Sequence, residues 1–278
     1  MIDLLILVII GVIGGFVGSM VGLAGGFLFV PALSFLGYPP YMVASTSLFA
    51  ACTNASTSAF VYSRKKLLTY PLALRLTIFA VPGALIGAYI ADSISMPDFK
   101  LIFAIVTLAV AGITIIRGRL KKNPNPVESI EAVKQLLKSV RTHKLIIVYA
   151  ACFFAGIVSS LFGIGGGVIF MPLLLAFFAI PVRFASPVSL LAVAILAGSG
   201  LVIHTALANT DFLRAAILAG GTLLGTRIGT RMLISKKLNE KTLKRLLAGL
   251  LFGVSAVFFI DLYFFPLIRF RVEFLSFI

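Results

Sequence analysis

Long apolar runs, separated by short polar connections, make up most of the chain. A membrane-spanning helix needs about 20 mostly apolar residues. Runs of about that length predict membrane-spanning helices at 3–22, 43–63, 71–91, 99–117, 145–162, 186–208, 213–234 and 246–266. Two shorter runs, 26–37 and 167–182, each follow a glycine cluster. The pattern therefore predicts an all-α integral membrane protein, a polytopic helical bundle with broken or short helices after the glycine clusters.

One polar connection is much longer than the others and divides this single transmembrane domain. The parts are a first half of about 1–117, the connection of about 118–144, a second half of about 145–266 and a short tail of 267–278. Within the connection, Asn125 and Pro126 have the residue types of a helix start, and apolar residues follow at helical spacing. This predicts an amphipathic helix on the cytoplasmic membrane surface; a solvated linker is the alternative.

The composition agrees with a membrane protein. Hydrophobic residues make up 60% of the chain and charged residues 12%, with a mean hydropathy of +1.12, whereas soluble domains average about 45–50% apolar and about 25% charged residues. A soluble enzyme, a disordered chain and a secreted disulfide scaffold are thereby excluded. Cys52 and Cys152 lie inside apolar runs and are interpreted as small apolar residues. The sequence shows no catalytic, metal-binding or cofactor-binding motif, so it predicts neither an enzyme nor a cofactor.

The net charge of +15 lies in the connections between apolar runs. We therefore interpret it as a topology signal rather than as a nucleic-acid-binding surface. If both short runs cross the membrane, 20 of the 24 Lys and Arg residues fall on one side, which is then cytoplasmic, and both termini lie outside. If the short runs re-enter instead, the termini move inside, and the sequence leaves this open. The expected location is the plasma membrane, with multiple passes.

The chain contains an internal repeat. Residues 22–31, GLAGGFLFVP, match 163–172, GIGGGVIFMP, at five of ten positions, and Ser19 and Ser160 fall in register just upstream. A later block, 82–91, resembles 220–229 and shares two glycines that suit close helix packing. The connection that is basic in one half lacks Lys and Arg in the other, which predicts two halves of opposite orientation. Inverted repeats are typical of secondary transporters; chance similarity between glycine-rich segments is the alternative.

The glycine clusters are the candidate substrate site. Helices that begin near Phe27 and Val168 leave their first N–H groups unpaired, and such helix ends bind anions. Close helix packing through small residues is the alternative. The residues expected to bind the anion are, in the backbone, Gly25, Gly26, Gly166 and Gly167 and, as side chains, Ser47, Asn54, Ser189 and Arg227.

The side chains have alternative interpretations. Hydroxyl and amide groups can donate hydrogen bonds to oxyanions, but Ser47, Asn54 and Ser189 can equally join neighbouring helices. Ser186 and Pro187 have the residue types of a helix start. His204 either carries a coupling proton or is a bystander near the membrane interface.

These motifs resemble the sulfite exporter TauE/SafE family. The resemblance rests on the two glycine–proline blocks, on Ala44-Ser45-Thr46-Ser47-Leu48 and on Pro82-Gly-Ala-Leu-Ile-Gly87, and it covers nearly the whole chain. The first block departs from the pattern, because Ala24 stands in place of a glycine. The resemblance implies a plasma-membrane permease for small sulfur-containing anions such as sulfite, sulfoacetate and other C2 sulfonates. The residues alone indicate a transporter, and an anion as its substrate.

The sequence thus predicts a secondary transporter that works by alternating access between its two halves. The expected partners are a small anionic substrate and the lipid bilayer, without nucleic acid. A coupling proton or sodium ion and a homo-oligomer stay open. A passive anion channel is the alternative function, followed by a membrane-embedded enzyme or assembly factor.

Overall fold

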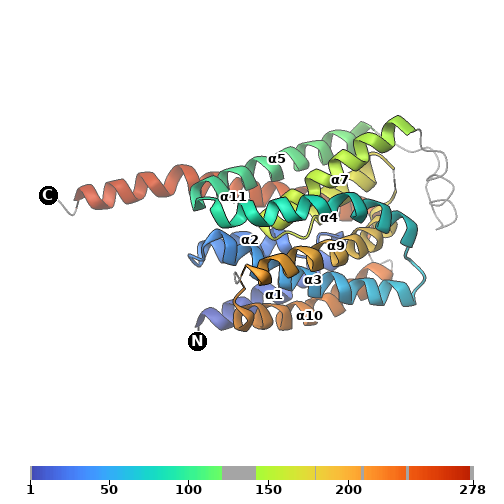
Figure 1. Cartoon of the computed structure of the whole chain (residues 1–278), viewed down its shortest axis with the longest axis horizontal. Coiled ribbons are helices and arrows are strands. Elements are labelled where there is room, and N and C mark those ends of the chain that lie inside the picture. Colours follow the sequence, from blue (N-terminus) through green and yellow to red (C-terminus); the bar gives the residue numbers. More distant parts are fainter. Residues whose placement is uncertain (1, 121–141, 179, 208–209, 236–237, 276–278) are drawn as a thin grey trace.

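The computed structural model describes residues 2–120, 142–178, 180–207, 210–235 and 238–275 (Figure 1). The linker helix expected within 118–144 falls almost wholly outside this described part. The helices of the described part are α1 (Ile2–Val21), α2 (Gly26–Phe35), α3 (Pro40–Arg64), α4 (Tyr70–Ser93), α5 (Met96–Leu120), α7 (Thr142–Phe162), α8 (Gly167–Ala176), α9 (Val182–Ala206), α10 (Phe212–Ile234) and α11 (Glu240–Leu275).

The helices confirm the predicted fold class. Each long apolar run corresponds to one long helix, and the two short runs correspond to α2 and α8, of 10 residues each. Among the described residues, 5 helices are long and apolar enough to cross a membrane by length and composition. Large apolar side chains such as Ile78, Leu213 and Ile228 are exposed on the outer surface. Such a surface suits lipid rather than water.

Each short helix begins at a turn that reverses the chain. Gly18 and Gly14 of α1 let Gly25 and the ring of Phe29 approach closely, so α2 runs back along α1. A helix of 10 residues is about 15 Å long, half the hydrocarbon thickness of about 30 Å, so α2 alone is too short to span the membrane and returns the chain toward the end where α1 begins. The start of α1 and the end of α11 lie at one end of the bundle, opposite the α3–α4 connection (Figure 1).

Long helices pair closely across the two halves. α1 packs along α10, and α7 packs along α4, while α3 and α9 lie against each other between these pairs. Gly221 and Gly225 of α10 contact backbone carbonyls of α1, and Gly83 and Gly87 of α4 contact backbone carbonyls of α7. These are the glycines whose spacing predicts close packing, because only a residue without Cβ allows such contact.

The start of α9 differs from the prediction. The helix begins at Val182, directly after Pro181, and Pro187 lies inside it. The carbonyl of Pro181 accepts from the N–H groups of Phe184 and Ala185, at 2.9 and 2.8 Å, and the Glu240 side chain accepts from Val182 N–H at 2.6 Å. With these partners the helix starts before Ser186, which is therefore free to contact another helix.

The two ends of the bundle differ in charge. At the end that carries the α4–α5 connection, Lys100 pairs with Asp261 at 2.6 Å and Arg214 with Asp211 at 2.7 Å. Basic residues at the opposite end include Arg64, Lys65, Lys66, Arg183, Arg231, Lys241, Lys244 and Arg245. The positive-inside rule predicts that this second end is cytoplasmic.

Candidate functional site

The two glycine turns, residues 22–25 and 163–166, share one backbone conformation. In each turn the same three positions have a left-handed backbone, which costs a residue with a Cβ about 1–2 kcal/mol and suits glycine. These positions are Gly22 (φ 81°), Ala24 (φ 57°) and Gly25 (φ 84°) in the first turn and Gly163, Gly165 and Gly166 (each φ 79°) in the second. Ala24, the departure from the glycine pattern, thus adopts the conformation of its counterpart Gly165.

The turns meet each other in the interior of the bundle. A Cβ placed on Gly26 would lie 2.6 Å from the Cα of Ile164, and one on Gly167 would lie 2.8 Å from the Gly22 carbonyl oxygen. All residues of both turns are buried. The start of α2 therefore lies against the backbone of the second turn, and the start of α8 against the backbone of the first.

The contact brings together the backbone N–H groups of two helix starts. The first backbone hydrogen bonds of α2 and α8 are accepted by Gly25 and Gly166, at 2.9–3.2 Å and 3.0 Å. Within the described residues, the N–H groups of Gly25, Gly26, Gly166 and Gly167 have no such acceptor. Unpaired N–H groups carry the partial positive charge of a helix start.

The hydroxyl protons of Ser47 and Ser189 are not available to a bound anion, because both are donated to backbone carbonyls. The Ser47 hydroxyl donates to the Gly163 carbonyl at 2.8 Å, and the Ser189 hydroxyl donates to the Gly22 carbonyl at 2.7 Å. Each serine belongs to one half and holds the first glycine of the turn in the other half. A hydroxyl has one proton, so in this conformation both serines position the turns.

Asn54 joins three helices beside the first turn. Its Nδ2 donates to the Gly15 carbonyl of α1 at 3.4 Å, and its Oδ1 accepts from Ser58 at 3.1 Å and from Thr226 of α10 at 2.9 Å. The side chain is fully buried. Its amide oxygen is thus satisfied by two hydroxyls, and the network ties α3 to the α1–α10 pair.

Arg227 lies apart from the turns. It is exposed on α10, whereas its neighbour Thr226 faces Asn54 in the interior. The prediction that Arg227 meets the substrate has no support from this geometry. The run of small residues in α10 places Thr226, not Arg227, on the inner face.

Two backbone carbonyls, those of Ser19 and Ser160, anchor the chain just before the turns, and the sequence predicts their hydrogen bonds only weakly. The Ser19 carbonyl, just before the first turn, accepts from Tyr62 at 2.9 Å and from Ser186 at 3.2 Å. The Ser160 carbonyl, just before the second, accepts from His204 Nε2 at 2.9 Å. The register of Ser19 and Ser160 in the repeat marks these positions, but the donors lie far away along the chain.

Three buried hydroxyls near the second turn lack a hydrogen-bond partner among the described residues: those of Thr46, Ser159 and Ser160. Thr46 precedes Ser47, which contacts this turn, and the two serines end α7 just before it. An unpaired buried hydroxyl costs free energy, so these groups are candidate donors to a bound substrate.

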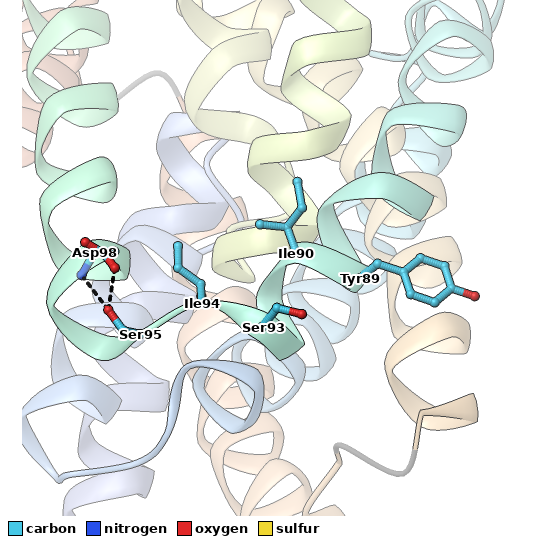
Figure 2. A pocket seen from close by; sticks show the side chains of 6 residues that line it. All are labelled: Tyr89, Ile90, Ser93, Ile94, Ser95 and Asp98. Atoms are coloured by element: carbon cyan, nitrogen blue, oxygen red, sulfur yellow. Dashed lines mark hydrogen bonds between the residues drawn. The ribbon is translucent and has the colours of Figure 1, made fainter.

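A separate open pocket lies at the α4–α5 connection (Figure 2). It is lined by Tyr89, Ile90, Ser93, Ile94, Ser95 and Asp98. The Ser95 hydroxyl and the Asp98 carboxylate are hydrogen-bonded, as at a helix start. This pocket contains none of the predicted site residues. In the described part of the chain, no group of three or more His, Cys, Asp or Glu residues could hold a metal ion.

Comparison with known proteins assigns the family. The model of the family described as "Sulfite exporter TauE/SafE" matches residues 7–258. The chain belongs to the sulfite exporter TauE/SafE family. It is accordingly a membrane transporter of the plasma membrane, with multiple passes, a bilayer environment and a small substrate.

The relatives of this TauE/SafE chain carry transporter names. It is 27% identical to "Probable membrane transporter protein YunE" of Bacillus subtilis (strain 168) over 255 residues, which cover 86% of this chain and 90% of the relative. A "Probable membrane transporter protein" of Xylella fastidiosa (strain 9a5c) is 30% identical, covering 77% of this chain and 83% of the relative. "Sulfite exporter TauE/SafE family protein 3" of Arabidopsis thaliana is 36% identical over 29% of this chain and 17% of its own length. No solved structure matches the chain.

Proposed function

We propose that this TauE/SafE protein moves a small sulfur-containing anion, such as sulfite or a C2 sulfonate like sulfoacetate, by alternating access. The anion would bind where the two glycine turns meet. The family supplies the sulfur chemistry, and the printed name of the Arabidopsis relative agrees with it. The geometry of the turns supplies the preference for negative charge.

The observation that carries the proposal is the backbone contact of each helix start with the turn of the other half. The N–H groups of Gly25 and Gly26 from one half, and of Gly166 and Gly167 from the other, lack acceptors in the described structure. Two positive helix ends at one buried place repel each other and attract an anion. Broken helices at this depth are tolerated where they line a substrate site, as in other secondary transporters.

The side chains divide into two roles in this proposal. Ser47 and Ser189 position the turns through their hydrogen bonds to Gly163 and Gly22, and each hydroxyl can rotate toward the anion when that turn moves. Asn54 ties α3 to the α1–α10 pair beside the first turn. Thr46, Ser159 and Ser160 carry buried hydroxyls with no partner among the described residues. These three are the proposed side-chain donors to the anion, because a bound oxyanion would satisfy them.

Transport requires the two turns to separate. Backbone-to-backbone contact at Gly26 and Gly167 leaves no room for an anion, so the substrate enters only when the two turns move apart. We propose that the two halves are inverted repeats, and that α1–α10 and α7–α4 are the pairs that move. The close contact favours this mechanism over a permanently open channel.

Counterflow through purified protein in liposomes tests the proposed function. Vesicles loaded with unlabelled sulfite should accumulate labelled sulfite transiently and saturably, and sulfoacetate should compete, whereas sulfate and small carboxylates should compete less. Flux that rises linearly with concentration and shows no counterflow would favour the channel. Equal competition by carboxylates would contradict the sulfur specificity, and absence of all anion flux would contradict the proposed function.

A further inference from the structure

His204 is a buried titratable group inside the membrane domain. It lies in the last turn of α9, and its side chain is fully buried. Its Nε2 lies 2.9 Å from the Ser160 carbonyl, three residues before Gly163. An ionisable residue within a membrane-spanning segment is costly and is therefore a candidate for a functional role.

The hydrogen bond fixes the tautomer of the ring. A carbonyl oxygen only accepts, so Nε2 carries the proton and donates it, and in the neutral ring Nδ1 is then an acceptor. Nδ1 is buried and has no hydrogen-bond partner in the described part of the structure. The ring therefore offers one unoccupied lone pair in the interior, which can bind a proton.

The first half has a different residue at the corresponding place. Tyr62 donates to the Ser19 carbonyl at 2.9 Å, as His204 does to the Ser160 carbonyl at the same distance. Tyr62 follows Ser47 by 15 residues on α3, and His204 follows Ser189 by 15 residues on α9. A phenol keeps its proton near neutral pH, whereas an imidazole changes charge between about pH 5 and 8. Of these two positions, only that of His204 can respond to a proton.

Asp92 is the charged residue that acts on His204 within the described part of the chain. The Asp92 carboxyl group, in the last turn of α4, interacts electrostatically with the ring, and Asp92 is exposed at the end of the bundle that carries the α4–α5 connection. The other helices packed on α9 also carry charges. Asp3 lies in the first turn of α1, at the same end of the bundle as Asp92, and Asp261 of α11 pairs with Lys100. The charges at the opposite end are Arg64 of α3, Arg75 of α4, His143 and Lys144 of α7, and Glu240, Lys241, Lys244 and Arg245 of α11.

We propose that His204 binds the coupling proton of the transport cycle, which rests on the proposed function. A proton from water at the outer end, near Asp92, forms a new N–H bond at Nδ1, and the ring becomes an imidazolium ion. The imidazolium has two donors and needs a second acceptor, which the Asp92 carboxylate can provide. A ring drawn toward Asp92 weakens its hydrogen bond to the Ser160 carbonyl and releases the end of α7 before the second turn.

The test compares exchange with pH-driven uptake in the same liposomes. Labelled sulfoacetate is the probe, because its sulfonate stays ionised and the substrate itself takes up no proton near neutral pH. His204→Gln keeps an N–H that can donate to the Ser160 carbonyl but binds no proton. His143→Gln changes the chain's other histidine and is the matched control. A gradient of about one pH unit corresponds to about a tenfold concentration ratio.

We expect the wild type and His204→Gln both to show counterflow of sulfoacetate. The wild type and His143→Gln should also concentrate it severalfold under the pH gradient, whereas His204→Gln should not. His204→Tyr, which copies the first half, should behave like His204→Gln and serves if the glutamine variant does not fold. A His204 variant that still responds to the gradient would overturn the inference, as would a wild type that exchanges sulfoacetate but ignores the gradient. A wild type without any counterflow would instead contradict the proposed function.

Discussion

The turns at 22–25 and 163–166 have the same backbone conformation but different side chains around them. Ala24 stands opposite Gly165, and Tyr62 stands opposite His204. Seven residues after Ser47 the first half has Asn54, whereas seven residues after Ser189 the second half has Leu196. The shared feature is the set of unpaired N–H groups, so we assign anion binding to the backbone. The differing side chains give each half its own role in holding or releasing its turn.

We expect the largest loss of transport when a side chain is added at the glycines where the two turns touch. Gly167→Ala places a Cβ 2.8 Å from the Gly22 carbonyl oxygen, and Gly167→Leu fills more of the same space. We expect either variant to insert normally but to lose transport by about 100-fold or more, since small displacements in a preorganised site have effects of that size. Counterflow in liposomes, with expression and gel filtration as folding checks, measures this.

Gly220→Ala is the matched control for that variant. A Cβ added at Gly220 would have no atom within 4 Å, so transport should stay near the wild-type rate. Full transport by well-folded Gly167→Ala would show that the contact between the turns is not the substrate site.

The next effect tests the polar network of the first half. Asn54→Leu copies Leu196 and leaves the Ser58 hydroxyl without its acceptor, whereas the Thr226 hydroxyl keeps the Thr222 carbonyl. A buried hydroxyl without a partner costs about 1–3 kcal/mol, so we expect a lower unfolding temperature in detergent. Thr53→Val, on the same helix, removes only a bond to the Phe49 carbonyl and should change it less. Equal unfolding temperatures for both variants would mean that the network adds no stability.

A smaller effect is expected from the serines that cross between the halves. Ser47→Ala and Ser189→Ala each remove one hydrogen bond to a turn glycine, worth about 1 kcal/mol, and should slow counterflow by a similar factor of about five. Ser199→Ala removes a bond within α9 and serves as the control. A large effect at one serine alone would show that the two turns are not held in equivalent ways.

The smallest effect concerns the one residue that departs from the glycine pattern. Ala24 adopts φ 57°, so Ala24→Gly relieves a strain of about 1–2 kcal/mol but adds flexibility to the unfolded chain, which costs about 0.5–1 kcal/mol. We expect a rise of about 1 kcal/mol or less in the free energy of unfolding, measured by thermal denaturation. Gly165→Ala should do the opposite, because its Cβ would lie 2.7 Å from Val193. A lower free energy of unfolding in Ala24→Gly would show that the left-handed backbone of Ala24 is not strained.

The sequence predicts the helices and the turns well because both follow from local rules. Apolar runs long enough to cross a bilayer become long helices, and the glycines of residues 22–26 and 163–167 permit left-handed turns. The close helix packing at the paired glycines of α4 and α10 also follows from the spacing of these glycines. The one clear error, at Ser186, arises because Pro181 and Glu240 provide a cap that local sequence does not reveal.

The directions of the side chains could not be predicted in the same way. Ser47 and Ser189 satisfy the carbonyls of glycines more than a hundred residues away, and only the packing of α3 against α9 determines this. Arg227 and Thr226 are neighbours in sequence, yet the rotation of α10 buries the threonine and exposes the arginine. Polar residues in a membrane helix thus indicate an interior face before they indicate a ligand.

Equilibrium binding of labelled sulfite to purified protein is the most direct test of the central claim, that the two helix starts form one anion site. Our account predicts saturable binding of a single anion per chain, lost in Gly26→Ala and equally in Gly167→Ala, and kept in Gly220→Ala. Two independent sites, or unchanged binding when either turn is altered in folded protein, would contradict it.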